Sequence, residues 1–570
     1  MINPSNYRGI TLLSCLGKLF TSLLNDRLNE YLDVFGILSF NQAAFRKNHS
    51  ITDHIFTMKC LIDQFFNHRK KLYCVFIDFE KAFDTIWRKA LWHKLIQQGV
   101  SGKILQVIHN IYQNAKSTIE LNGENSDYFQ SFQGIRQGEN LSPILFSMFV
   151  NDLEQYLEEN QCDSLKFCRN DNTHWFKLFL LLYADDTVLL AETPEALQLM
   201  LNNVNEYCKR WKLKINVEKT KAIIFQKRKN LHPPKFYLDG GEIELVDSFR
   251  YLGVILNYNG SFSLCRKTLV SHASKAMFFV LKKVRQYSMD VDLAIQLFDS
   301  MVTPILTTFN CEVWGYENLD ILERVQLKFY KYLLKLKKGT PNIFIYGELG
   351  RCPLETTVKC RMVKYWAKLL NSPKLSSRMY TIIFASHQNG KTSKWIECIQ
   401  RILEHNGLGD FWLGQRCPNP EYLSLSLSTR LRDQYIQRWA TSVSESRLGI
   451  FYRSFKTEFG FEDYLRVLPD DLRIPLCRFR CSNHPLPIEM GRYDGSPRED
   501  RLCTKCDMHC IGDDFHFILQ CPFFDTLRSK YIKPYYKRNP SMLKYGQLFN
   551  SSGRTRKNLA LFIRNGLKAY

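Results

Sequence analysis

The sequence predicts an α+β fold, in which strands and helices are mixed along the chain instead of alternating strictly. Two apolar stretches carry this prediction. Residues 178–191 have the pattern of a buried hairpin whose polar turn holds Asp185 and Asp186. Residues 72–77 form a continuous apolar strand that ends at Asp78. We expect both stretches to lie in the same sheet.

The other elements follow from apolar spacing, helix caps and turn residues. Thr193 and Pro194 together give a helix start, with a cap followed by a proline at the first helical position. An amphipathic helix is also expected near the N-terminus, with an apolar face that comprises Leu16, Phe20, Leu24, Leu28 and Tyr31. The remaining expected elements are helices over residues 84–98, 103–113, 143–158 and 194–212, a hairpin at Asn122-Gly123 and a strand over residues 214–225.

The second half of the chain has mainly helical patterns. In residues 257–340, the cations Lys282, Lys283 and Arg285 form a basic cluster. Residues 320–338 predict a basic amphipathic helix with one apolar and one cationic face, although a solvated helix face explains the same pattern. Residues 345–480 predict further helices, to which the sequence assigns no chemistry.

Composition favours a polyanionic partner. Across 570 residues, 78 Lys and Arg oppose 56 Asp and Glu, which gives a net charge of +22. Nucleic acid is the first candidate and an anionic membrane surface the weaker one. No charge-free apolar run reaches the ~18 residues that a membrane-spanning helix needs, so no membrane partner is expected. Most of the 18 cysteines are scattered, as in reduced intracellular proteins, and one group clusters near the C-terminus.

The three acids at the strand ends suggest a metal site. Asp185 and Asp186 are adjacent in a turn, where they repel each other unless a cation is bound. Asp78 is placed to meet Asp185 across a neighbouring strand, and carboxylates that bridge two metal ions form the clamp for nucleotidyl transfer. The alternatives are a solvated surface turn for the pair and a helix cap for Asp78, a role that also suits Asp84.

A glycine-containing loop separates these acids along the chain. Gly134 and Gly138 permit close backbone approach, and Ser142 with Pro143 marks a helix start. Such a loop suits a nucleotide or base lying against the backbone. Glycine-rich turns are common, so this signal is weak by itself.

The clustered cysteines have the spacing of a zinc site. Two ligands from a tight turn and two from a following segment can close a tetrahedral Zn²⁺ site. The predicted ligands are Cys503, Cys506, His516 and Cys521, in the pattern Cys-x2-Cys-x9-His-x4-Cys. Cys510 and His509 are alternative ligands, and chance clustering of core thiols is the alternative to a metal site.

Taken together, the motifs resemble those of reverse transcriptases, in the order typical of that family. The motifs that show this resemblance are residues 77–84, 134–143 and 183–186. Their amino-acid sequences are similar to those of the polymerases of non-LTR (LINE-type) retrotransposons. Residues 211–221 resemble the family's lysine motif and residues 249–254 its primer-grip hairpin. Residues 4–10 and 42–46 resemble its finger motifs. The resemblance covers residues 1–340 closely and continues more loosely to the cysteine cluster.

The resemblance implies a role for the acids and for one lysine. Asp78 and Asp185 are expected to bind two Mg²⁺ ions, with Asp186 completing the acidic site. Lys219 is a candidate general acid for the leaving pyrophosphate, or else an ordinary solvated lysine.

The resemblance also implies substrate contacts. Phe83 is expected to stack under the sugar and exclude a ribose 2′-hydroxyl, with a core aromatic as the alternative. Gln137 and Gly138 are expected to contact the incoming nucleotide or the template base. Arg8 and Arg46 are expected to hold triphosphate oxygens, and solvated surface charges are the alternative for both.

The implied architecture is a right-hand polymerase with fingers, palm and thumb, followed by a helical region and a small zinc-knuckle module. The expected boundaries are fingers and palm over residues 1–256, thumb over 257–340, a helical connector over 341–480, the zinc module over 481–530 and a basic tail over 531–570. Because the match begins within the fingers, the chain is expected to be N-terminally truncated.

The predicted function is that of an RNA-directed DNA polymerase. Its expected partners are an RNA template, a DNA primer or target DNA, and dNTPs, in a ribonucleoprotein of the cytoplasm and nucleus. The alternative is a catalytically inactive remnant that binds nucleic acid through its basic surface and zinc knuckle. The sequence does not predict an oligomeric state.

Overall fold

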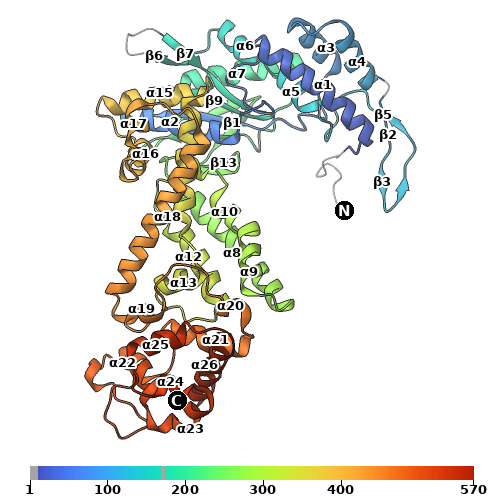
Figure 1. The fold of residues 1–570 in the computed structure, drawn as a ribbon. Coiled ribbons are helices and arrows are strands. Elements are labelled where there is room, and N and C mark those ends of the chain that lie inside the picture. Colours follow the sequence, from blue (N-terminus) through green and yellow to red (C-terminus); the bar gives the residue numbers. More distant parts are fainter. Residues whose placement is uncertain (1–10, 114, 169–173) are drawn as a thin grey trace. The chain divides into compact units, whose positions relative to one another are not determined.

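The computed structural model describes residues 11–113, 115–168 and 174–570. The chain forms two compact units (Figure 1). Unit 1 contains the residues up to Cys265 together with Trp366–Ile399, and unit 2 contains Arg266–Tyr365 and Gln400–Tyr570. Each unit therefore combines two separate stretches of sequence.

A six-stranded sheet forms the centre of unit 1, with the strand order β11-β12-β10-β1-β9-β8. The central strand β1 is buried at all six positions and pairs antiparallel with both β9 and β10, as its continuous apolar sequence predicts. The strands are β1 (Leu72–Ile77), β8 (Leu180–Tyr183), β9 (Asp186–Ala191), β10 (Lys221–Phe225), β11 (Phe236–Leu238) and β12 (Gly241–Leu245).

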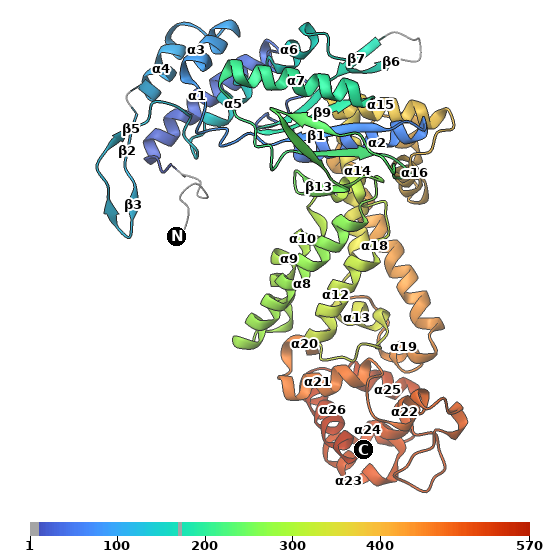
Figure 2. The same ribbon diagram turned by 180° about the vertical axis from the view of Figure 1, so that it is seen from behind.

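Helices cover both faces of this sheet. Helix α7 (Pro194–Trp211) lies on one face and α2 (Ile51–Asn67) on the other (Figures 1 and 2). The predicted start of α7 is confirmed, because the backbone N–H of Ala196 donates to Thr193 Oγ1 at 3.2 Å. The other helices that lie wholly in unit 1 are α1 (Cys15–Val34), α3 (Arg88–Gln97), α4 (Gly102–Gln113), α5 (Ser142–Phe149), α6 (Leu153–Glu159) and α15 (Leu375–Gln388).

Short antiparallel hairpins complete unit 1. The predicted turn at Asn122-Gly123 is confirmed, since both residues have positive φ, +53° and +85°. The paired strands are β2 (Lys116–Ser117) with β5 (Phe129–Gln130), β3 (Glu120–Leu121) with β4 (Glu124–Asn125), β6 (Leu165–Cys168) with β7 (His174–Leu178), and β13 (Ser248–Tyr251) with β14 (Val254–Asn257).

Two predicted elements are shorter than expected. The helix expected from residue 84 begins at Arg88, and the strand expected from residue 214 begins at Lys221. Phe79 instead forms a bridge with Ile215, and the Glu80 N–H donates to the Lys214 carbonyl at 2.8 Å. This long-range pairing replaces the start of the strand that local patterns favour. Ahead of α3, the Ile86 carbonyl instead accepts from the Gly134 N–H at 2.9 Å.

Two helices also differ from the prediction. The single helix expected over residues 143–158 is interrupted between α5 and α6, where the Asn151 side chain hydrogen-bonds Ser39 N and the Ile37 carbonyl. In α1, Leu24 and Leu28 are buried as predicted, but Leu16 is 78% exposed. Asn140 Nδ2 donates to the Lys18 carbonyl in the first half of α1 at 3.2 Å. Leu16 and Phe20 are nevertheless exposed, so the predicted apolar face is wrong for the first turns.

Unit 2 is helical, as predicted for residues 257–340. The expected helix over 320–338 ends at Leu333. The main helices are α8 (Ser263–Gln286), α9 (Val291–Met301), α10 (Thr303–Thr307), α11 (Cys311–Trp314), α12 (Asp320–Leu333), α13 (Asn342–Leu349), α17 (Gly409–Gly414), α18 (Pro420–Glu445), α19 (Tyr452–Phe455), α20 (Tyr464–Val467), α21 (Asp470–Arg480), α22 (Pro487–Tyr493), α23 (Asp525–Tyr531), α24 (Pro534–Lys537), α25 (Met542–Phe549) and α26 (Gly553–Gly566). Helices α8, α14 (Leu354–Leu370) and α16 (Lys394–His405) carry residues of both units. No helix in the described part of the chain is long and apolar enough to cross a membrane.

A buried ion cluster joins three segments of unit 2. The Arg480 guanidinium donates to both carboxylate oxygens of Glu348 at 2.9 Å and lies 2.9 Å from Glu462. The Tyr464 hydroxyl donates to Glu348 at 2.6 Å. Burial opposes the charged form of Arg480, but the carboxylates of Glu348 and Glu462 outweigh it and raise the pKa of Arg480. The cluster is therefore paired throughout and fixes α13 against α21.

Replacing Arg480 tests this cluster. Arg480→Met should lower the free energy of unfolding by about 3–5 kcal/mol, because it leaves Glu348 buried without its cation. The measurement is urea denaturation of the full chain. Arg466→Met is the matched control, because the Arg466–Asp292 pair is exposed by 58% and 40%, and it should cost no more than about 1 kcal/mol. Equal losses in the two variants would contradict the assigned role.

Candidate functional site

Two of the predicted acids lie at the same edge of the sheet. Ile77 in β1 is paired with Thr187 in β9, so the next position outward holds Asp78 on one strand and Asp186 on the other. Both acids line a cavity of about 590 Å³, together with Glu218 and Lys219. The antiparallel register of β1 and β9 therefore brings acids distant in sequence to one cavity, which Lys221 and Arg250 also line.

The third acid lies in the turn itself. Asp185 and Ala184 form the two-residue connection between β8 and β9, and Ala184 adopts a positive φ of +57°. Asp185 is half-buried, whereas Asp186 is exposed. The predicted hairpin is therefore confirmed, with its turn at the paired carboxylates.

Aromatic side chains form another wall of this cavity. Phe249 of β13 stacks on Phe76 of β1 with ring centroids 4.5 Å apart, and Tyr251 lies 5.3 Å from the same ring. Burial, and then the nearby charge of Asp186, raises the pKa of Tyr251. The segment expected to resemble a primer-grip hairpin thus lies directly beside the acidic edge.

The main chain of Asp78 is held by the segment that carries Lys219. The Asp78 N–H donates to Thr220 Oγ1 at 3.3 Å, and the Asn216 N–H donates to the Asp78 carbonyl at 2.8 Å. Lys219 Nζ lies 3.8 Å from Asp78 Oδ2 and its side chain is 65% exposed. The structure thus places Lys219 beside the acids, and its role as a general acid stays a prediction.

The glycine loop approaches the segment after β1 closely. Gly134 has a φ of +77°, and a Cβ atom there would lie 2.5 Å from the Asp84 carbonyl oxygen. Gly138 also has a positive φ, +99°. Gln137 Nε2 donates to Asp84 Oδ1 at 3.2 Å, and both residues line a second cavity of about 1050 Å³. The loop therefore needs glycine and presents Gln137 to a cavity large enough for a nucleotide.

Arg88 holds this loop in place, and sequence reasoning missed it. Its guanidinium donates to the carbonyls of Gly134 at 2.8 Å, Ser131 at 2.5 Å and Gln133 at 3.2 Å. It also donates to the Tyr112 carbonyl at 2.9 Å. These partners lie far from Arg88 in sequence, so no local pattern indicates the role.

Phe83 contacts both the core and the glycine loop. Its ring stacks on Phe146 with centroids 5.2 Å apart, and the side chain is half-buried. The Phe83 carbonyl accepts a hydrogen bond from the Ile135 N–H at 2.7 Å. Its predicted discrimination against a 2′-hydroxyl stays a prediction.

Arg46 is engaged within its own loop. Its Nη1 donates to the carbonyls of Ser39 at 3.2 Å and Gln42 at 3.3 Å, and its Nη2 lies 3.6 Å from Asp33 Oδ1. Burial lowers the pKa of Arg46, and Asp33 partly opposes the shift. Its predicted contact with a triphosphate stays a prediction. Arg8 lies outside the described residues.

The four predicted zinc ligands come together in unit 2. Among the described residues, they are the one group of three or more such side chains whose ligand atoms all lie within 4.8 Å of one another. Cys503 Sγ lies 3.9 Å from Cys521 Sγ, and Cys506 Sγ lies 3.3 Å from His516 Nε2. Cys510 contributes its carbonyl instead, which accepts from the Cys503 N–H at 2.8 Å. Three sulfurs and one nitrogen are a donor set that suits a tetrahedral metal ion.

The surroundings of this cluster favour the thiolate of Cys503, the protonated thiol of Cys521 and the neutral imidazole of His516. Burial opposes ionisation of Cys503, but hydrogen bonds from Tyr570 and the neighbouring groups outweigh it and lower the pKa of Cys503. Burial raises the pKa of Cys521 to about 12. Burial, and then the charge of Arg528, lowers the pKa of His516, which favours the neutral imidazole that binds metals.

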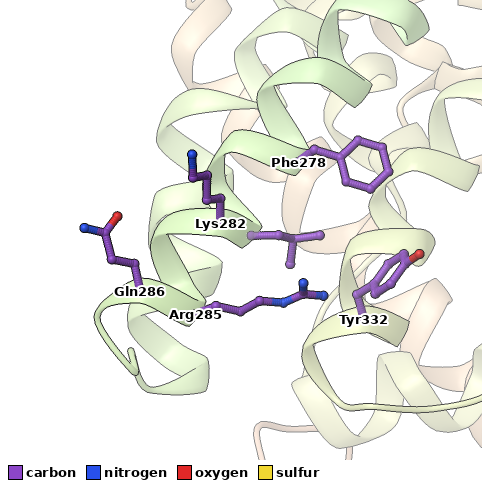
Figure 3. A pocket seen from close by; sticks show the side chains of 6 residues that line it. Phe278, Lys282, Arg285, Gln286 and Tyr332 are labelled. Atoms are coloured by element: carbon purple, nitrogen blue, oxygen red, sulfur yellow. The ribbon is translucent and has the colours of Figure 1, made fainter.

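A basic and aromatic surface lies on α8 and α12 of unit 2. It includes a cavity of about 510 Å³, in which Arg285 points towards Tyr332 (Figure 3). The six residues that line it, all in the described part of the chain, include no carboxylate: Phe278, Leu281, Lys282, Arg285, Gln286 and Tyr332. Phe278 and Tyr332 are 47% and 41% exposed. Cations beside exposed aromatic rings suit contact with nucleic acid.

Comparison with known proteins agrees with these features. Residues 3–256 match the family model for reverse transcriptase (RNA-dependent DNA polymerase). The chain is 27% identical over 334 residues to a probable RNA-directed DNA polymerase from transposon BS of Drosophila melanogaster, covering 57% of this chain and 35% of the relative. It is also 27% identical over 269 residues to a Pol polyprotein from the type-1 retrotransposable element R2 of Nasonia vitripennis, covering 45% and 25%.

A solved structure of telomerase from Candida tropicalis with a fragment of telomeric RNA is 15% identical, with a TM-score of 0.32, covering 64% of this chain and 56% of that one. The chain spans 35% and 25% of the length of the two curated relatives named above. The resemblance found in the sequence is confirmed: residues 3–256 match the reverse transcriptase family model, and the chain is similar to RNA-directed DNA polymerases of transposable elements.

Proposed function

We propose that this chain is an RNA-directed DNA polymerase, which adds dNTPs to a primer 3′-hydroxyl on an RNA template. The observation that carries the proposal is the acidic cavity at the end of β1 and β9. Asp78 and Asp186 line it, Lys219 lies beside them, and the whole arrangement belongs to a reverse transcriptase domain. An exposed acidic edge with a nearby cation suits chemistry on a metal-bound triphosphate.

We assign two Mg²⁺ ions to Asp78 and Asp185, with Asp186 beside them. When bound, the ions supply Lewis acidity that activates the primer hydroxyl and neutralises charge on the triphosphate. Asp78, Asp186 and Glu218 line one cavity and offer a carboxylate donor set that fits such ions, and Lys219, Lys221 and Arg250 line the same cavity. Lys219 donates the proton that the leaving pyrophosphate needs, from the position 3.8 Å from Asp78.

The substrate contacts fall on the loop around Gln137. We assign Gln137 and Gly138 to the nucleotide or template base, because the loop backbone borders a cavity of about 1050 Å³. Phe83 lies under this loop and is assigned to the sugar. Arg46 and Arg8 are assigned to the triphosphate, a role that for Arg46 requires its guanidinium to exchange loop carbonyls for phosphate oxygens.

In this proposal the sheet of unit 1 is a polymerase palm, with the fingers formed by residues of 1–256 outside the sheet. The helices over 257–340 are a thumb, whose cations on α8 and α12 contact the phosphates of an RNA–DNA duplex. The net charge of +22 supports RNA and DNA as partners. A ribonucleoprotein of the cytoplasm and nucleus is the setting that such partners imply.

We assign one structural Zn²⁺ to Cys503, Cys506, His516 and Cys521. The support is the compact donor set described above, with Cys503 in a setting that favours thiolate and His516 in one that favours neutral imidazole. The metal would join the turn at 503–506 to the segment 516–521, in the manner of a zinc knuckle. Basic residues around this site would then hold nucleic acid.

One observation favours the alternative of a nucleic-acid-binding protein without catalysis. Arg46, a proposed triphosphate ligand, is engaged with two loop carbonyls and Asp33. The basic surface on α8 and α12 does not depend on that residue. A chain that binds RNA but extends no primer would have this second function.

Removing one carboxylate tests the polymerase. Asp185→Asn should lower primer extension on poly(rA)–oligo(dT) by at least about 10²-fold, because a metal ligand is lost. RNA binding should stay within about twofold, since the basic surfaces are unchanged. Glu192→Gln is the matched control, because Glu192 follows the opposite end of β9 and pairs with exposed Lys70.

The possible results separate the two functions. Extension by the wild-type chain and the control, but not by Asp185→Asn, supports the polymerase. Equal extension by all three chains contradicts the assigned role of Asp185. RNA binding without extension by the wild-type chain supports the alternative.

Metal analysis tests the zinc site. The purified chain should contain about one Zn²⁺, and the double variant Cys503→Ser plus Cys506→Ser should contain none, because it loses two of four ligands. Cys510→Ser should retain the ion, since Cys510 lies outside the ligand cluster. Zinc retained by the double variant, or lost from Cys510→Ser, would refute this ligand set.

A further inference from the structure

Residues 366–399 lie far beyond the matched reverse transcriptase domain, yet they belong to unit 1. Helix α15 packs along α2, which lies on one face of the sheet (Figures 1 and 2). Helix α2 is buried around most of its circumference, which is typical of a helix enclosed on two sides. The sheet encloses one side and residues 366–399 enclose another.

The polar centre of this interface is Asp53, near the start of α2. Ser376 Oγ donates to Asp53 Oδ1 at 3.0 Å, and Lys374 Nζ lies 3.2 Å from Asp53 Oδ2. Lys374 also donates to the Asn48 carbonyl, in the loop before α2. The Asp53 side chain is only 8% exposed, so these partners compensate a nearly buried carboxylate.

Further contacts extend along the rest of α2. The rings of Trp395 and Phe56 meet edge to face with centroids 4.8 Å apart. Ser386 Oγ donates to Gln64 Oε1 at 3.1 Å, and Asn67 donates to the Thr392 carbonyl at 3.0 Å. The interface therefore holds α2 from its first turn to its last.

On its other side, α2 reaches the acidic edge through His54. The ring of His54 lies 5.8 Å from the ring of Tyr183, and its Nδ1 lies 3.2 Å from the Tyr251 hydroxyl. Tyr183 pairs with Asp186 in the hairpin that contains Asp185. Asp53 and His54 are consecutive in α2, and they thus contact α15 and the hairpin that contains Asp185, respectively.

We propose that residues 366–399 are a positioning element of the polymerase, which acts through Asp53 and His54 on the hairpin that carries Asp185 and Asp186. This inference rests on the function proposed above. The physical reason is that Lys374 and Ser376 bind Asp53, whose Oδ2 also accepts from the Ser50 N–H and hydroxyl at the start of the helix. They add long-range contacts to the first turn of α2, which carries His54 against Tyr183. Small displacements of a reacting group lower rates steeply, by up to about 10²-fold for 1 Å.

The test removes the two partners of Asp53 that lie in residues 366–399 and leaves its contacts with Ser50 in place. Lys374→Ala plus Ser376→Ala should lower kcat for primer extension about tenfold, while the KM for dNTP and the affinity for RNA change less than about twofold. The conservative pair Lys374→Arg plus Ser376→Thr should restore kcat, because it keeps the charge and the hydroxyl. Ser386→Ala is the matched control, because it removes a hydrogen bond between the same two helices far from His54.

A readout independent of activity separates this inference from the proposed function. Hydrogen exchange of the backbone amides at 182–187 should be faster in the double-alanine variant and unchanged in Ser386→Ala. If the wild-type chain extends no primer, the proposed function fails, and faster exchange still supports the positioning role. Unchanged exchange at 182–187, or equal loss of kcat in Ser386→Ala, overturns the inference.

Discussion

The antiparallel pairing of β1 with β9 is the constraint on which the candidate site depends. Because Ile77 faces Thr187 across this pairing, the strands end with Asp78 and Asp186 side by side. Gathering like charges at one edge is unfavourable by itself. The register is nevertheless strongly determined, since β1 is buried at all six positions and a slip by one residue would draw Lys71 or Asp78 into the buried part of the sheet. Burial of the strand thus forces the acids together, and the cations proposed to bind there would remove the conflict.

Several arginines in this basic chain bind the protein's own main chain and carboxylates. Arg88 donates to carbonyls of the glycine loop, Arg528 to those of Ile518 and Cys521, and Arg480 to buried carboxylates. The planar guanidinium, with five donors, suits loops whose carbonyls lack partners in regular structure. The net positive charge therefore overstates the charge available to nucleic acid, which is concentrated on exposed side chains such as those of α8 and α12.

The division of the chain into units differs from the order of its sequence motifs. Residues 366–399 belong to unit 1, although a sequence-based division treats residues 341–480 as one helical connector. The sequence of α2 does indicate that this helix is covered on more than one side, because its apolar residues occur on most faces of the helix and not on one stripe. Such a helix needs covering on two sides, but its sequence does not indicate which distant segment provides the second cover.

By itself, the sequence determined the features that short-range physics controls. These are the buried strand before Asp78, the hairpin around Asp185, the turn at Asn122-Gly123, the capped start of α7 and the cysteine spacing. Apolar runs, positive-φ turn residues and caps act within a few positions, so they are visible locally. Only the tertiary structure decided that Arg88 holds the glycine loop, that Cys506 and not Cys510 joins the cluster of candidate metal ligands, and that Leu16 and Phe20 of α1 are exposed. Each of these depends on partners distant in the chain, which meet only after the strands and helices have packed.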